Sequence, residues 1–225
     1  MIGAAAIAVV ASVLVAARTP AASAGTEAVS VHAAAIRTVV VQGVPGQLTI
    51  TGVRSSQVAM TGQLHWTGRS AAVAVPPRPA NHLLRLVYRC AASSPCTANL
   101  RLTVPSRTAI VLHQPGGHVL LMGLAGALRI TARNVDVQAA GLRSPVLAAS
   151  VTSGHLSATF SRPPRQVAVT LRSAQATLRL PATVSYRLGQ QVTAGYLRAD
   201  IPQASNASRA ISARVDSGEL ELLPR

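Results

Sequence analysis

Carboxylates are the side chains that could perform acid–base chemistry, and this 225-residue chain has only six Asp and Glu residues. Asp216, Glu219 and Glu221 are the ones that cluster in the sequence. Enzymes that cleave glycosidic bonds need a carboxylate pair as acid and base. This cluster is therefore where a polysaccharide-active β-helix enzyme would have its site. On a strand, Glu219 and Glu221 would share one outward face, about 7 Å apart.

The same carboxylates have a structural explanation. If neighbouring repeats lie in register, Arg198 falls beside Glu221, and an ion pair across the strands explains the cluster better than catalysis. We therefore predict that the chain is not an enzyme and has no catalytic residues. The polysaccharide-active enzyme is the first alternative.

Metal and cofactor chemistry is not indicated. The histidines do not occur at the i, i+4 spacing of a helical metal site, and no second CxxC or nearby pair of histidines accompanies Cys90 and Cys96. We expect no metal ion and no cofactor. In an exported chain, two cysteines across a short connection predict a disulfide. It would pin a hairpin of about residues 83–105, made of Leu83–Cys90 and Ala98–Pro105.

Positive charge is the strongest compositional feature. The 21 basic residues are all Arg, and the net charge is +15. Arg101, Arg129, Arg179 and Arg198 stand at outward strand positions and form a candidate polyanion-binding face, for an anionic cell-wall polymer or lipid headgroups. A solvated face that keeps a β-protein soluble is the alternative explanation. Specific nucleic-acid binding is not expected, because the few aromatic residues are scattered singly and give no stacking platform.

The elements that must position these side chains are short repeats. VTSGHLSATF begins at Val151, LRSAQATLRLP at Leu171, VTAGYLRADIP at Val192 and VDSGELELLP at Val215. After each central residue, apolar and polar residues alternate, which is typical of half-buried strands. The predicted repeat glycines, with Ala174 in place of one, are Gly46, Gly117, Gly126, Gly154, Gly195 and Gly218.

A period of about 20 residues is typical of stacked supersecondary units. We predict an all-β fold, a β-solenoid or single-stranded β-helix-like stack of strand–turn–strand repeats, with a β-sandwich as the alternative. A hydrophobic helix would precede it. Residues 1–24 predict a signal peptide or membrane anchor, because Ile2–Ala17 is uncharged and small residues follow. Residues 25–35 would be a linker, and residues 36–225 the repeat domain.

Several motifs in this order resemble the bacterial putative-adhesin family, in particular its actinobacterial members. They are the recurrent V-x-S-G-x-L-x-φ motif, the opening TVVVQGVPGQLTITG, the cysteine-flanked loop before LTVP and the ending ISARVDSGELELLPR. The resemblance covers about residues 36–225. It implies an exported or anchored β-repeat domain on the extracellular side of the membrane, or secreted, with no catalytic residues to carry over.

We therefore expect a non-enzymatic β-repeat domain of the cell envelope that acts by display, adhesion or polyanion binding. The second alternative is a domain that senses a ligand for an envelope-stress regulator.

Overall fold

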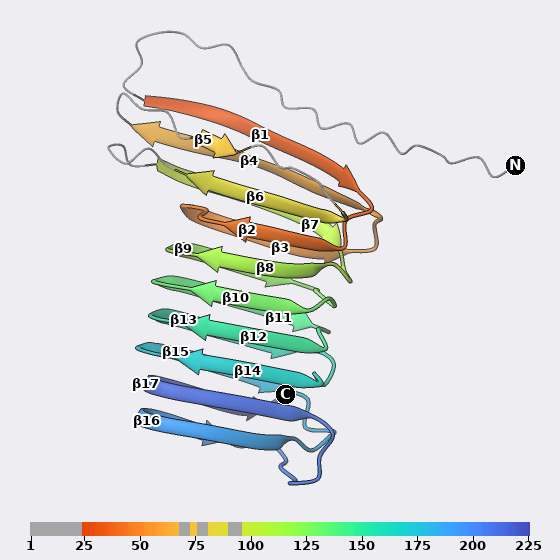
Figure 1. Cartoon of the computed structure of the whole chain (residues 1–225), viewed down its shortest axis with the longest axis vertical. Helices are drawn as coiled ribbons and strands as arrows, with labels where there is room; N and C mark the ends of the chain where they lie inside the picture. The colour runs from red at the N-terminus through yellow and green to blue at the C-terminus, as the bar shows by residue number, and fades with distance from the viewer. Residues whose placement is uncertain (1–23, 68–72, 76–80, 90–95) are drawn as a thin grey trace, which may run out of the picture.

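The computed structural model describes residues 24–67, 73–75, 81–89 and 96–225, which are all-β and contain no helix. The all-β prediction is confirmed. The strands form layers along the long axis of the molecule, and most layers contribute one strand to each of two parallel ladders (Figure 1). The predicted signal peptide or anchor and its helix lie outside the described residues, except for Ala24. No helix within those residues has the length and apolar character needed to cross a membrane.

We call the two sets of paired strands ladder A and ladder B and list them from the top of Figure 1. Ladder A contains β6 (Leu83–Arg89), β2 (Thr38–Gln42), β8 (Ala109–Gln114), β10 (Leu128–Ala132), β12 (Val146–Val151), β14 (Gln166–Leu171) and the first halves of β17 (Ala210–Pro224) and β16 (Arg187–Ala199). Ladder B contains β7 (Cys96–Pro105), β3 (Gly46–Val53), β9 (Gly117–Met122), β11 (Val135–Leu142), β13 (Gly154–Phe160), β15 (Ala174–Leu180) and the second halves of β17 and β16.

The core lies between the ladders and follows from the alternation of the sequence. In ladder B, Leu156 pairs with Ala176, and Ala176 pairs with Leu220, so equivalent apolar residues stack in one inward column. All three are at most 3% exposed. Their sequence neighbours, such as His155 and Gln175, point outward and are exposed. Each layer has too little apolar surface to fold alone, so the layers stabilise one another.

The order of the layers differs from the order of the chain at both ends. β17 lies between the β14/β15 layer and β16. Likewise, the β2/β3 layer lies between β6/β7 and β8/β9. The register itself remains as expected, since Leu220 pairs with Leu197 and Glu221 with Arg198. A periodic pattern makes each repeat compatible with several neighbours, so periodicity cannot give this order.

One residue of each layer, at or near the point where its ladder B segment begins, belongs to a turn column. It contains Ala98 and, among the predicted repeat glycines, Gly46, Gly117, Gly154, Gly195 and Gly218, together with Ala174. Gly126 lies outside the column, in the segment before β10, and Val135 occupies the position expected for it. In that layer the residue with left-handed backbone conformation is not Val135 but the preceding residue, Asn134, with φ +49°. Because Asn tolerates this region better than other side chains, a valine can begin the strand.

Residues 25–34 of the segment 25–35, expected to be a linker, form a strand instead. β1 (Ala24–Ala34) pairs antiparallel with β4 (Gln57–Thr67), and β4 pairs antiparallel with β7. Val31 and Ala33 are buried in this sheet. β1 and β4 therefore cover the N-terminal end of ladder B, and the folded domain begins before residue 36.

The predicted hairpin of residues 83–105 is also corrected. Within the described parts of the chain, β6 pairs with β2 and with β5 (Val73–Val75), whereas β7 pairs with β3 and β4. The two strands are thus the two sides of one layer and not hydrogen-bonded partners. Cys90 lies outside the described residues, so its disulfide with Cys96 stays a prediction.

One buried polar residue holds a turn of the stack together. The side chain of Gln114, 2% exposed, accepts a hydrogen bond from Val44 N at 3.0 Å and donates one to Val44 O at 2.6 Å. Gln114→Leu would leave both backbone groups without these partners. We expect it to lower the free energy of unfolding by about 2 kcal/mol, measurable by urea denaturation. An unchanged denaturation midpoint would show that Val44 finds other partners.

Candidate binding surfaces

The arginines of the predicted polyanion-binding face do not lie on one face. Arg129 lies on the outer side of ladder A, between Val111 and Ala148 of the adjacent strands. Arg101 and Arg179 lie on the outer side of ladder B, one near each end of the stack. The alternation of apolar and polar residues predicted an outward side chain for each of these arginines, and all of them are exposed. The alternation could not predict that these arginines lie far apart on the surface.

Arg198, the fourth of these arginines, is held by carboxylates. Its Nη2 lies 2.6 Å from Oδ2 of Asp200, and Glu221 is its register partner on β17. The hydrogen bond and charge of Asp200, with a smaller contribution from Glu221, raise the pKa of Arg198 above its ordinary value. The ion pair expected with Glu221 is therefore made with Asp200. Much of the positive charge of Arg198 is compensated within the protein.

The acidic cluster considered for glycan cleavage is spread along β17. Glu219 lies between Gln175 and Tyr196 in ladder B, and Glu221 lies between Thr177 and Arg198. Asp216 faces arginines, with Oδ1 at 2.9 Å from Arg214 Nε and Oδ2 at 4.0 Å from Arg172 Nε. Glu219 and Glu221 project side by side from one strand instead of facing each other across a groove. This arrangement suits ion pairing better than acid and base catalysis.

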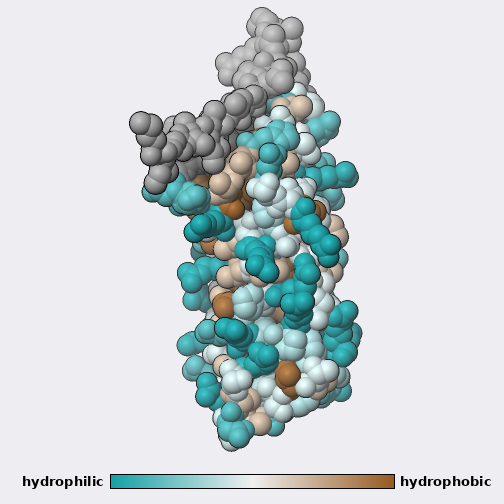
Figure 2. Space-filling model, turned by 90° about the vertical axis from the view of Figure 1, so that its right-hand side faces the viewer, coloured by the Kyte–Doolittle hydropathy of each residue, from teal (hydrophilic) through white to brown (hydrophobic). Residues whose placement is uncertain are grey.

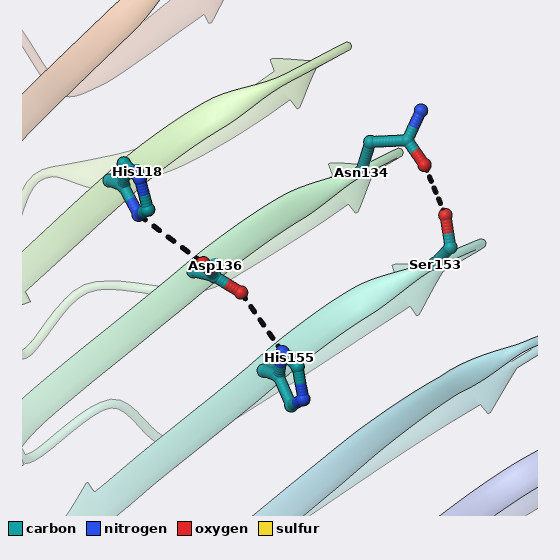
Figure 3. Close-up of polar contacts among 5 residues, drawn as sticks. All are labelled: His118, Asn134, Asp136, Ser153 and His155. Atoms are coloured by element: carbon teal, nitrogen blue, oxygen red, sulfur yellow. Dashed lines mark hydrogen bonds and ion pairs between the residues drawn. The ribbon is translucent and has the colours of Figure 1, made fainter.

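A row of His and Asp side chains crosses three strands on the outer side of ladder B (Figure 3). Sequence analysis did not recognise this row. Nδ1 of His118 lies 3.3 Å from Oδ2 of Asp136, and Nδ1 of His155 lies 3.0 Å from Oδ1. At the edge of the same sheet, Ser153 donates a hydrogen bond to Asn134. Each of these three His and Asp residues directly follows a residue of the turn column in the sequence. This shared position in the repeat is the sequence signal that could have shown that they lie side by side. Across the described ranges, no three His, Cys, Asp or Glu residues are placed to hold a metal ion.

Comparisons with known proteins give distant structural likenesses. No protein-family description matches the sequence, and no curated protein matches it either. A putative cell adhesion protein from Clostridium sporogenes is 11% identical, with a TM-score of 0.48 over 88% of this chain and 100% of that one. A putative adhesin from Bacteroides fragilis is 11% identical, with a TM-score of 0.38 over 88% of this chain and 97% of its own.

A putative adhesin from Parabacteroides distasonis is 10% identical, with a TM-score of 0.31 over 88% of this chain and 97% of that chain. These neighbours come from Clostridium and Bacteroidetes and do not support the actinobacterial type expected from the sequence. Because identity and structural overlap are this low, the function of this chain must be inferred from its own side chains.

Proposed function

We propose that this chain is a non-enzymatic β-solenoid domain of the bacterial cell envelope, exported or membrane-anchored, that binds anionic partners. The observation that carries the proposal is the imbalance between its arginines and its carboxylates. The ion pairs of the described residues use Asp136, Asp200 and Asp216. Two histidines and three arginines lie against these carboxylates, while most other arginines stay exposed. The result is a positive surface potential that attracts polyanions.

The stack favours binding by a surface over catalysis. Its outward residues are aligned in columns across the layers, so mostly polar side chains recur along the long axis of the molecule. A repeat surface of this kind suits an extended partner. The place at the envelope is supported by the uncharged segment Ile2–Ala17 and the small residues after it.

Salt dependence provides the test of polyanion binding. We expect the full chain to bind linear polyphosphate at 50 mM salt and to bind it at least tenfold more weakly at 200 mM salt. The reason is that the release of counterions drives such association, and added salt opposes it. Isothermal titration at several salt concentrations measures this. Absence of binding at 50 mM salt, or an affinity that does not change with salt, would contradict the proposal.

Enzyme activity is tested separately. Glu219→Gln would abolish turnover of a glycan if the acidic cluster were catalytic. We expect the wild-type chain to release no reducing ends from cell-wall polysaccharides. Release that Glu219→Gln abolishes would establish the alternative.

A further inference from the structure

We propose that a linear polyanion, a chain carrying phosphate or sulfate groups, binds lengthwise along one edge of the stack. This edge, called here the loop edge, is where each ladder B strand ends and the next ladder A strand begins. The inference rests on the proposed function and assigns it a site. The arginines of the loop edge are Arg37, Arg54, Arg107, Arg143, Arg162, Arg165, Arg209 and Arg225. None of them belongs to the face predicted from the sequence.

Backbone hydrogen bonds hold these arginines in successive layers. Arg143 N donates to Leu124 O at 2.8 Å, and Arg162 N donates to Leu142 O at 3.4 Å. Because Leu142 directly precedes Arg143, the residues Arg143 and Arg162 occupy adjacent layers. Figure 2 looks onto this edge and shows hydrophilic residues along its length.

A second adjacent pair lies further along the same edge. Arg165 O accepts a hydrogen bond from Ala210 N at 2.9 Å, which places Arg209 in the layer next to Arg165. On the N-terminal side, Arg37 O accepts one from Ala109 N at 2.9 Å, which places Arg37 close to the loop that holds Arg107.

The charge of the loop edge is not compensated within the described residues. None of its arginines takes part in a close ion pair there. In the described loops of this edge the one acidic side chain is Asp200, and Arg198 lies 2.6 Å from it. Arg225 is committed otherwise, since its Nη1 donates to Phe160 O at 3.0 Å. The remaining guanidinium groups are free to form bidentate hydrogen bonds with phosphate or sulfate oxygens.

Protection of a sheet edge does not explain these arginines. Charged residues guard strands whose backbone groups lack a partner, and here such groups occur at the ends of the stack, as on β16, which among the described residues pairs with β17 and no other named strand. The backbone of the loop edge is already hydrogen-bonded between layers. Like charges in adjacent layers repel each other, so this edge is costly for stability and is better explained by a ligand.

The spacing favours a linear partner over isolated anions. The layers from β2 to β17 are five intervals apart and extend about 24 Å at about 4.8 Å per layer. A polymer lying along the edge can meet an arginine in each of these layers except that of β10, because residues 123–127 before β10 include none. Nucleic acid fits less well, because the exposed aromatic Tyr196 lies on the outer side of ladder B and not on this edge.

The test compares two triple variants of the full chain with the same net charge. Arg143→Gln/Arg165→Gln/Arg209→Gln removes three arginines of the loop edge. Arg101→Gln/Arg129→Gln/Arg179→Gln removes three exposed arginines from the outer sides of the ladders. Binding of long polyphosphate, of tripolyphosphate and of anionic phospholipid vesicles is measured by titration at several salt concentrations, with thermal melting to verify the fold.

We expect the loop-edge variant to bind long polyphosphate at least tenfold more weakly, with a salt slope smaller by about 2. The outer-side variant should lose less than threefold. Equal losses in the two variants would show that charge is spread over the whole surface and overturn the inference. It would also be overturned if tripolyphosphate matched the long chain in affinity per phosphate, or if the loop-edge variant lost only binding to anionic phospholipid vesicles. Failure of the wild type to bind would instead refute the proposed function.

Discussion

Leu220→Asp is expected to lower the free energy of unfolding by at least about 5 kcal/mol, because it places a carboxylate in an aliphatic core. Leu220 is fully buried. Ala176 and Leu197 are its neighbours in the adjacent layers. An aspartate there has no hydrogen-bond donor other than backbone groups that the ladders already use. It also removes an apolar side chain whose burial contributes about 1.5–3 kcal/mol.

The position of Leu220 within the stack increases this effect. β17 lies between β15 and β16 and pairs with both, so a disturbed β17 weakens two layer contacts. Urea denaturation followed by circular dichroism measures the change. The matched control is Glu219→Lys, one residue earlier on the half-exposed outer side, which should alter stability by less than about 1 kcal/mol. Equal melting temperatures for the two variants would refute the assigned register.

Gly218→Ala has the second largest expected effect, a loss of about 3 kcal/mol. The φ angle of Gly218 is +119°, where a side chain is strained. An added Cβ would lie 2.0 Å from the carbonyl oxygen of Ala174 in the next layer. That oxygen belongs to the paired strand β15 and cannot move without disturbing the ladder.

A second glycine separates backbone strain from steric collision. Gly141 also has a positive φ, +64°, but an added Cβ would meet no atom within 4 Å. Gly141→Ala should therefore cost only about 1–2 kcal/mol. Thermal and urea unfolding of both variants provide the comparison. If Gly218→Ala were no more destabilising than Gly141→Ala, the close approach of neighbouring turns would not limit this position.

The candidate binding surface shows where prediction from the sequence stopped. Alternation within a strand identified Arg101 and Arg179 as outward residues. It does not tell where in the stack each strand lies, and the two residues lie near opposite ends. The loop-edge arginines follow no strand pattern. Arg143 and Arg162 come together only because successive layers place their loops above one another. Because the loops differ in length, aligning their sequences with one another could not show that Arg143 and Arg162 lie in neighbouring layers.

The sequence by itself determined the strands of the four C-terminal repeats, their inward sides and their register, because alternation of apolar and polar residues is local and is recorded in each of these repeats. Leu220 and Leu197 lie side by side as that pattern requires. The tertiary structure alone decided which layers are neighbours, that residues 25–34 belong to a strand and that arginines gather along one edge. These features depend on pairing between segments far apart in the chain. Repeats with the same period fit several partners equally well, so only packing of the whole stack selects among them.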